Sequence, residues 1–378
     1  MIEFNMPSLG ADMDEGTLLE WRVAPGSPVT RGQVVAVVDT AKAAVDVECW
    51  QDGTVLELLV QPGAKVAVGT PIATLLEAGE SAASVHRPAP AQAPAAPPAA
   101  SVAPPAVSAS RPRISPAARQ RAAELGIDAS QLSGSGPQGA VTLQDVEHAA
   151  RPATAGERTA AMRQAIGAAM SRSKREIPHY YLSENVPLGQ AMAWLKAHNA
   201  ELPPEQRLLP GVLQLKAIAL ALRDYPQLNG FWQDGAFRPA AGIHLGVAIA
   251  LRQGGLIAPA LHDVADKPLS VLMAELGELV QRARSGSLRS SELADASLTV
   301  TQLGDQGVDA VFGVIYPPQV ALVGVGRLAE RPWVSDGQLG VMPCAQFSLS
   351  ADHRASDGHY GARFLAEVRR LLQTPENL

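Results

Sequence analysis

Apolar and polar positions alternate along the first 80 residues between Pro-Gly turns, and the same pattern occurs twice. The segment that starts at Gly16 is repeated by the segment that starts at Gly53, 37 positions later, and Val23 is related to Val60 in the same way. The other pairs with this separation are Pro25/Pro62, Gly26/Gly63, Val29/Val66 and Gly32/Gly69. Such a repeat predicts a duplicated strand set. We expect two short antiparallel sheets, related by a pseudo-twofold axis, that face each other across Val and Leu side chains.

One lysine lies at the junction of the two repeats. The segment from Asp39 to Glu48 has strand-like sequence on both sides of Lys42. The pattern therefore predicts that Lys42 occupies the exposed tip of a hairpin.

The alternation of apolar and polar positions ends near residue 79. Residues 80–111 consist almost entirely of Ala, Pro, Ser and Val, with hardly any large apolar side chain. Such a segment cannot bury enough surface to offset its chain entropy, and its prolines favour extended stretches. We therefore expect residues 1–79 to form a tethered domain, followed by a linker over 80–111.

A short compact segment follows over residues 112–149. Ser115 before Pro116 is typical of a helix start, Gly126 of a helix end, and Thr142 of a second helix start. These signals predict a small domain of two helices around a glycine-rich loop, followed by a second linker over 150–156.

The remaining residues, 157–378, predict a larger α/β domain. Helical spacing is seen over 157–174, 212–222 and 358–372, and buried-strand patterns over 243–251 and 319–326. The alternation of helices and strands supports the α/β assignment.

Composition narrows the function classes. A length of 378 residues predicts two or three domains, and a net charge of −6 without long basic runs argues against nucleic acid as a partner. The only cysteines, Cys49 and Cys344, cannot build a disulfide framework. The start of the sequence has no signal-peptide pattern and no apolar stretch is long enough to span a bilayer. We therefore expect a soluble, cytoplasmic protein without membrane contact.

A candidate catalytic residue lies near the carboxyl terminus. The sequence around His353, Asp-His-Arg-Ala-Ser-Asp-Gly, falls where an alternating strand ends and a helix begins. Imidazole titrates near neutral pH, so it can take a proton from a thiol and return it. A lone histidine beside Asp and Arg is more often structural, so this motif needs support from the rest of the chain.

That support is a resemblance along the whole length. The motif His-Arg-x-x-Asp-Gly followed by an amphipathic helix resembles the active-site motif of the dihydrolipoamide acyltransferases, the core components of 2-oxo acid dehydrogenase complexes. The order of the segments is similar too. The resemblance implies an all-β lipoyl barrel-sandwich domain, a small α-helical peripheral-subunit-binding domain and an α/β coenzyme A-dependent acyltransferase domain related to chloramphenicol acetyltransferase.

The resemblance assigns roles to residues of this chain. Lys42 would carry lipoic acid in amide linkage. The related biotin carriers usually have methionines around the lysine, whereas Ala41 and Ala43 flank it here, and Ala41 stands where lipoyl domains usually have an acidic residue. In catalysis, His353 would be the general base for the coenzyme A thiol.

Two more residues complete the implied active site. Asp357 would orient the loop or an arginine. Thr301, in Leu-Thr-Val-Thr-Gln-Leu-Gly, would donate a hydrogen bond to the oxyanion. The resemblance implies no metal. It also implies a homotrimer that builds a larger core, with each active site lying between two subunits.

The same resemblance implies two partner enzymes. A thiamine-diphosphate-dependent decarboxylase would supply the acyl group, and a flavin-dependent dihydrolipoamide dehydrogenase would reoxidise the arm. Arg113, Arg119 and Arg121 would contact partners, while Ala123 and Ala140 are uncharged where the binding domain often has basic residues.

Two alternatives stay open at this point. A branched-chain or acetoin-derived acyl group could replace acetyl, because the sequence has no readable acyl-pocket pattern. A non-catalytic lipoyl carrier or scaffold would keep the domains but lose the histidine, and the presence of His353 and Asp357 argues against it.

Overall fold

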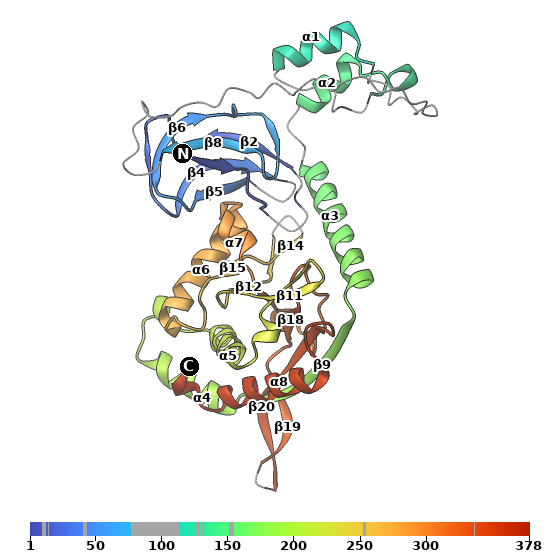
Figure 1. Cartoon of the computed structure of the whole chain (residues 1–378). Helices are drawn as coiled ribbons and strands as arrows, with labels where there is room; N and C mark the ends of the chain where they lie inside the picture. Colours follow the sequence, from blue (N-terminus) through green and yellow to red (C-terminus); the bar gives the residue numbers. More distant parts are fainter. Residues whose placement is uncertain are drawn as a thin grey trace, which may run out of the picture.

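The computed structural model describes residues 1–9, 13, 15–40, 44–76, 113–125, 129, 132, 134–150, 155–251, 255–335 and 337–378. These residues form an amino-terminal β domain, a small helical domain and a carboxyl-terminal α/β domain (Figure 1). The three-part fold predicted from the sequence is confirmed.

The amino-terminal domain contains two sheets that enclose one apolar core. One sheet has the order β1-β8-β6-β3 and the other contains β5-β4-β2-β7. The strands are β1 (Ile2–Asn5), β2 (Glu15–Trp21), β3 (Pro28–Val29), β4 (Gln33–Asp39), β5 (Ala44–Cys49), β6 (Gly53–Leu58), β7 (Lys65–Ala67) and β8 (Pro71–Leu76). Val38, Val45 and Ile72 are among the completely buried side chains between the sheets. The alternation in the sequence therefore separates core-facing from solvent-facing positions.

The turns reproduce the repeat at the level of the backbone. Gly26 and its counterpart Gly63 have φ angles of 87° and 90°, and Gly32 and Gly69 have φ angles of 81° and 84°. Glycine adopts this left-handed region without steric cost, which explains why the repeat keeps glycine at these positions.

The small domain contains α1 (Pro116–Leu125) and α2 (Leu143–Ala150). The Ser115 hydroxyl accepts a hydrogen bond from the amide of Ala118 at 3.2 Å, so Ser115 caps α1 as predicted. The core of the small domain is made of short side chains such as Ala118, Ala122 and Val146. Helix α3 (Ala155–Glu176) begins within the stretch assigned to the second linker.

The carboxyl-terminal domain is built on a mixed sheet of order β15-β12-β17-β18-β20-β19, with β9 paired to β20. Its helices are α3, α4 (Gly189–Ala200), α5 (Pro210–Asp224), α6 (Leu269–Ser285), α7 (Ser290–Ala294) and α8 (Gly358–Leu372). The strands of the main sheet are β9 (His179–Pro187), β12 (Leu245–Val247), β15 (Ala260–Leu261), β17 (Leu298–Gln302), β18 (Ala321–Val325), β19 (Ala329–Ser335) and β20 (Gln338–Asp352). The other strands are β10 (Gly230–Gln233), β11 (Ala236–Pro239), β13 (Ile249–Ala250), β14 (Leu256–Ile257) and β16 (Leu288–Arg289).

The core of this domain lies between the main sheet and the helices that cover it. Phe347 of β20 and Phe364 of α8 are completely buried in it, together with most of the apolar positions of α5. The hairpin of β19 and β20 extends away from this core at the bottom of Figure 1. The strand predicted over 243–251 is divided, because β12 pairs with β17 in the main sheet while β13 turns away to pair with β14.

Candidate active site

His353 lies in a tight turn between β20 and α8. Its backbone amide donates a hydrogen bond to the carbonyl of Pro178 at 2.9 Å, and the amides of Ala355 and Ser356 donate to the carbonyl of Asp352. The side chain of His353 is exposed in the single chain. The turn thus fixes the backbone of His353 firmly while its imidazole stays accessible.

The turn is anchored by an ion pair between a buried carboxylate and a partly exposed guanidinium. Asp352 is completely buried, and its carboxylate accepts hydrogen bonds from Nε and Nη2 of Arg354, with the Nη2 bond at 2.6 Å. The guanidinium of Arg354 lies 4.6 Å from the ring centre of Trp232, a cation–π contact. A buried carboxylate needs such partners, so Asp352 and Arg354 hold the two sides of His353 in place.

Tyr180 supports the imidazole from β9. Its ring meets the His353 ring edge-on at 5.5 Å, and its hydroxyl is 2.9 Å from the hydroxyl of Ser356. Burial raises the pKa of Tyr180 above its ordinary value, so the phenol stays protonated at neutral pH. The sequence analysis did not single out Tyr180, because its role depends on the pairing of β9 with β20, which brings it opposite Ala351.

Asp357 caps the helix that follows the turn, and it forms no ion pair with an arginine among the residues that the structure describes. Its Oδ1 accepts a hydrogen bond from the amide of Tyr360 at 2.8 Å, which caps the start of α8. The guanidinium of Arg354 pairs with Asp352. The helix cap fits the loop-orienting role expected for Asp357, and that role stays a prediction.

Thr301 lies in β17, in the interior of the same sheet. It pairs with Gly324 of β18, and Gly324 pairs in turn with Ser348 of β20. His353 lies in the turn that follows β20. The last residue of that strand, Asp352, comes four residues after Ser348, which at about 3.3 Å per residue is about 13 Å along the strand from the position paired towards Thr301. One chain therefore does not bring these two side chains together.

The hydroxyl of Thr301 is available to a further group. Thr301 is half-buried, and its side chain forms no hydrogen bond with any residue that the structure describes. Its neighbours in the strand differ, because Thr299 donates a hydrogen bond to Gln319 at 2.7 Å and Gln302 donates to Gln214 at 2.8 Å.

Lys42 lies outside the described residues, whereas both strands that lead to it are described. The last pair of the hairpin formed by β4 and β5 is Asp39 with Ala44. The predicted position of Lys42 at the tip of this hairpin stays a prediction.

Comparison with known proteins identifies the three domains. Residues 152–378 match the family model described as the catalytic domain of 2-oxoacid dehydrogenases acyltransferase. Residues 2–75 match the biotin and lipoyl model described as "Biotin-requiring enzyme", and residues 112–147 match the e3 binding domain. This chain belongs to the 2-oxoacid dehydrogenase acyltransferase family. We refer to the three units below as the lipoyl domain, the binding domain and the catalytic domain.

Curated relatives of the acyltransferase align over nearly the whole chain. The dihydrolipoyllysine-residue acetyltransferase component of the pyruvate dehydrogenase complex from Rhizobium meliloti is 32% identical over 99% of this chain and 98% of its own length. The lipoamide acyltransferase component of the branched-chain alpha-keto acid dehydrogenase complex from Pseudomonas aeruginosa is 35% identical over the same shares. The acyltransferase is thus an enzyme of this family.

Solved structures match the catalytic domain. A probable dihydrolipoamide acetyltransferase from Listeria monocytogenes is 29% identical, with a TM-score of 0.53 over 56% of this chain and 92% of its own. Dihydrolipoamide acetyltransferase from Azotobacter vinelandii has the same identity and TM-score over 56% of this chain and 88% of its own. That structure was solved to study a serine, a histidine and an asparagine in its catalytic mechanism.

The arginines predicted to contact partners lie on the binding domain of the acyltransferase. Arg113 and Arg119 are exposed, and Arg121 forms an ion pair with Glu124 at 2.9 Å. Asp145 holds the nearby loop, since its carboxylate accepts hydrogen bonds from the amides of Thr142 and Ser135. These bonds, led by that of Thr142, hold the pKa of Asp145 well below its usual range.

Within the described ranges, no group of three or more His, Cys, Asp or Glu side chains could hold a metal ion. The described helices also include none with the length and apolar character needed to cross a bilayer.

Proposed function

We propose that the acyltransferase transfers an acyl group, acetyl by preference, from a dihydrolipoyl-lysine arm to the thiol of coenzyme A. The observation that carries the proposal is the His353 turn, in which the ion pair of buried Asp352 with Arg354, together with Tyr180, fixes an accessible imidazole just after β20. This turn lies in the domain that matches the acyltransferase family.

His353 and Thr301 would perform the two tasks of the reaction. A thiol is mostly protonated at neutral pH, so His353 would accept the proton of the coenzyme A thiol as it attacks the acyl carbonyl. Thr301 would donate a hydrogen bond to the oxyanion that develops on that carbonyl, a contribution of about 3–4 kcal/mol in comparable sites. His353 would then return the proton to the departing sulfur.

A complete site needs a second copy of the chain. We propose a homotrimer in which His353 of one subunit meets Thr301 of the next, since in one chain the end of β20 before His353 is about 13 Å along the sheet from the position of Thr301. The β19–β20 hairpin supports association, because Val334, Leu339 and Val341 are 64%, 75% and 72% exposed. A solved relative of 30% identity and TM-score 0.53 is the cubic core of a pyruvate dehydrogenase multienzyme complex.

Lys42 would carry the lipoyl group. The β4–β5 hairpin that leads to it is closed by the pair Asp39 and Ala44, which fits a lysine presented at the end of a rigid sheet. The group supplies a thiol that accepts and releases the acyl group.

The partners would be those of a 2-oxo acid dehydrogenase complex. A thiamine-diphosphate-dependent decarboxylase would load the arm, and a dihydrolipoamide dehydrogenase would dock on the binding domain through Arg113, Arg119 and Arg121. The match to the e3 binding domain supports the second partner. A cytoplasmic location stays a prediction, since one relative of 30% identity, from Neurospora crassa, is named as mitochondrial.

A branched-chain acyl group is the second candidate. The Pseudomonas aeruginosa relative, 35% identical, is named for a branched-chain complex. Rates of transfer from acetyl-CoA and isobutyryl-CoA to free dihydrolipoamide would separate the two, and a higher kcat/KM for isobutyryl-CoA would refute the acetyl preference.

The test of the function compares two lysine variants. Protein made in a lipoate-competent host should carry lipoate on the peptide with Lys42, as found by mass spectrometry. Lys42→Arg should abolish turnover that depends on the protein's own arm and leave transfer to free dihydrolipoamide unchanged, whereas the matched control Lys65→Arg should leave both unchanged. No transfer to free dihydrolipoamide in the parent protein would favour the carrier alternative.

A further inference from the structure

A strand of the catalytic domain extends the sheet of the lipoyl domain. β5 is the edge strand of its own four-stranded sheet, and β16 pairs with it in parallel to give the order β16-β5-β4-β2-β7. Leu288 is opposite Val45, and Arg289 is opposite Asp46. The edge of a sheet presents unpaired backbone groups, and adding a strand is a common way to bind a partner there. The opposite charges of Arg289 and Asp46 suit adjacent positions.

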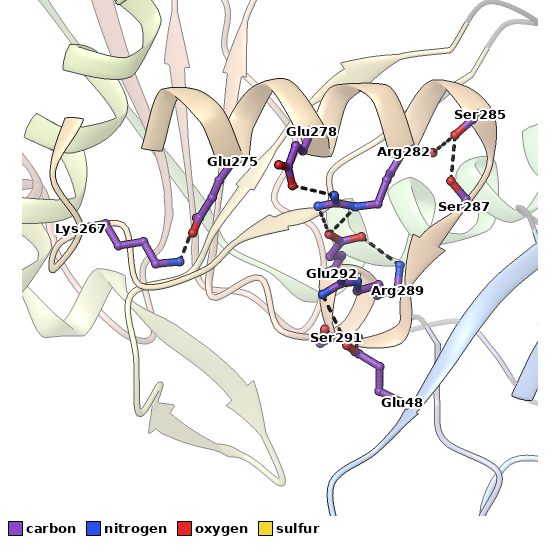
Figure 2. Close-up of polar contacts among 10 residues, drawn as sticks. All are labelled: Glu48, Lys267, Glu275, Glu278, Arg282, Ser285, Ser287, Arg289, Ser291 and Glu292. Atoms are coloured by element: carbon purple, nitrogen blue, oxygen red, sulfur yellow. Dashed lines mark hydrogen bonds and ion pairs between the residues drawn. The ribbon is translucent and has the colours of Figure 1, made fainter. Parts of the chain in front are cut away.

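A carboxylate of the lipoyl domain is buried in this contact. Glu48 of β5 is 6% exposed, and its Oε2 accepts a hydrogen bond from the hydroxyl of Ser291 at 2.6 Å and one from the amide of Ser291 at 3.3 Å. The amide of Glu48 donates to the hydroxyl of Ser290 at 3.1 Å. Figure 2 shows Glu48 reaching from the blue strand of the lipoyl domain towards Ser291 and Arg289.

Among the described residues, the partners of the Glu48 side chain lie in the catalytic domain. Besides Ser291, these are the hydroxyl of Ser290, which donates to Oε2 at 3.5 Å, and Nη1 of Arg289, which is 4.0 Å from Oε1. A glutamate that served only the lipoyl fold would not need serine hydroxyls 242 positions away. Glu48 is therefore suited to a contact between domains.

Contacts within the catalytic domain hold β16 and α7 in place. Arg282 of α6 donates to Glu292 of α7 through Nε at 3.0 Å and Nη2 at 2.6 Å, and Glu292 also accepts from the amide of Arg289 at 2.9 Å (Figure 2). Leu293 of α7 packs against the cores of both domains. This network positions Ser291 and β16 without help from the lipoyl domain, as a preformed docking surface requires.

The contact places the lipoyl domain over a cavity that leads towards the His353 turn. A cavity of about 430 Å³ is lined by Leu9 on the lipoyl side and by Leu293 and Gln319 on the catalytic side. Gln319 also lines a neighbouring cavity that reaches Arg354, the residue after His353. Strand β5 itself begins directly after residues 41–43, so docking at β16 brings the arm-bearing hairpin to this side of the catalytic domain.

We propose that β16 and α7 of the catalytic domain form a docking surface for the lipoyl domain of the same chain, and that Glu48 determines its fit. Docking limits the search of a tethered domain to one orientation, with the β4–β5 hairpin held on the side of β16. The use of this dock in acyl delivery rests on the proposed function, but the docking itself does not.

Cross-linking tests the register directly. Asp46→Cys combined with Arg289→Cys places two thiols at opposed positions of adjacent strands, within the usual Cα separation of a disulfide. Glu57→Cys with Arg289→Cys is the matched control, because Glu57 is exposed on the other sheet of the lipoyl domain. The native Cys49 and Cys344 are buried, which raises the pKa of both thiols and keeps them from competing.

In the full chain under mild oxidation, the pair made by Asp46→Cys and Arg289→Cys should close within one chain about tenfold or more faster than the control pair. In the first pair the disulfide joins the two introduced thiols, which lose two protons and transfer two electrons to the added oxidant, such as a glutathione disulfide buffer. Equal rates for both pairs would overturn the proposal, because they would show only collisions of a tethered domain. Covalent dimers would overturn the assignment to the same chain.

Variants on the two sides of the contact test the role of Glu48. Adding Glu48→Gln or Ser291→Ala to the first cysteine pair should slow closure by about tenfold, because a charge-assisted hydrogen bond is lost in a buried place. Glu57→Gln, the matched control, should not change the rate. Unchanged closure with both Glu48→Gln and Ser291→Ala would overturn the role of Glu48.

A single-turnover measurement separates docking from catalysis. In a chain without the introduced cysteines, Glu48→Gln should slow transfer from the chain's own acylated arm to coenzyme A about tenfold. It should leave transfer to free dihydrolipoamide unchanged. Slowing with both substrates would point to a damaged catalytic domain and would contradict the docking role. If the parent protein is inactive with both substrates, the proposed function fails while the cross-linking result still decides the dock.

Discussion

Thr301 lies in a strand of the main sheet, and His353 lies in the turn after another strand of that sheet. Contacts within the chain fix these two side chains to different degrees. Asp352 of β20 and Tyr180 of β9 fix the turn, together with Arg354 in the turn itself, so its geometry is complete within a single chain. Thr301, in contrast, has a hydroxyl without a hydrogen-bond partner among the described residues, although the strand around it is well paired. The difference teaches that one chain orients the His353 imidazole by itself, whereas it leaves the Thr301 hydroxyl without a described partner.

Such a division is expected if each active site forms between two copies. A base must keep its orientation before the substrate arrives, which favours fixing it by buried contacts within its own subunit. An oxyanion donor needs only to point into a site, so it can be supplied by the neighbouring subunit.

Removing the imidazole should have the largest effect. His353→Ala should lower transfer to free dihydrolipoamide by about 10³-fold, because no other group takes the thiol proton. The circular dichroism spectrum, the assembly size and lipoylation should not change, since the imidazole is exposed. The matched control is His359→Ala, an exposed histidine in the first turn of α8, and a similar loss there would mean that the loop and not the base was damaged.

Removing the hydroxyl should have the next largest effect. Thr301→Val should lower kcat by about 10²-fold with little change in KM, because the hydrogen bond is made to the developing oxyanion. Thr301→Ser should restore most of the activity. An equal loss in Thr301→Ser would assign the effect to packing in β17 and would contradict the donor role.

Mixing the two inactive variants tests whether the site is shared. Chains with His353→Ala and chains with Thr301→Val, co-assembled in equal amounts, should recover up to about a quarter of the parent activity, because one site in four then receives an intact residue from each chain. A site contained within one chain would show no recovery. The separately assembled variants, mixed without exchange of subunits, are the control.

The sequence predicted those features that depend on neighbours along the chain. The lipoyl domain follows from the repeat of Pro-Gly turns, and the helix expected over 358–372 has those bounds, because Asp357 caps it locally. The tight turn at His353 is also local, since its bonds to Asp352 span only a few residues. These parts of the fold and site were accessible without coordinates.

The rest depends on contacts between distant segments. Tyr180 meets Ser356, which is 176 positions away, and Glu48 meets Ser291, which is 243 positions away. The apolar run over 243–251 is also ambiguous, since a buried pattern does not show that β12 and β13 pair with different strands. Only the pairing register of the sheet shows that Thr301 and His353 lie at different positions along the strand direction.

Removing the anchor of the turn should have an intermediate effect. Asp352→Asn leaves the Arg354 guanidinium without its counter-charge, which should lower the free energy of unfolding by about 2–3 kcal/mol, less than for a fully buried pair because Arg354 is partly exposed. We expect kcat to fall by about tenfold as the imidazole loses its fixed position. Thermal unfolding and kinetics measure both effects.

The matched control for the anchor is Asp309→Asn, which removes an exposed carboxylate paired with Arg327 and Arg331. A surface pair contributes little, so we expect a change of no more than about 1 kcal/mol. If the two substitutions had equal effects on stability and activity, the buried position of Asp352 would not be what fixes the turn.

The smallest effect should come from the tyrosine that supports the imidazole. Tyr180→Phe keeps the ring against His353 and removes only the hydrogen bond with Ser356, so we expect a loss of about 1 kcal/mol in stability and of about threefold in kcat. Because burial raises the pKa of Tyr180, the phenol is neutral in the parent protein and its removal changes no charge near the base. The pH profile of kcat should therefore keep its midpoint. A shifted midpoint would show that Tyr180 takes part in proton transfer, and the turn would then contain two titrating groups instead of one base with a passive support.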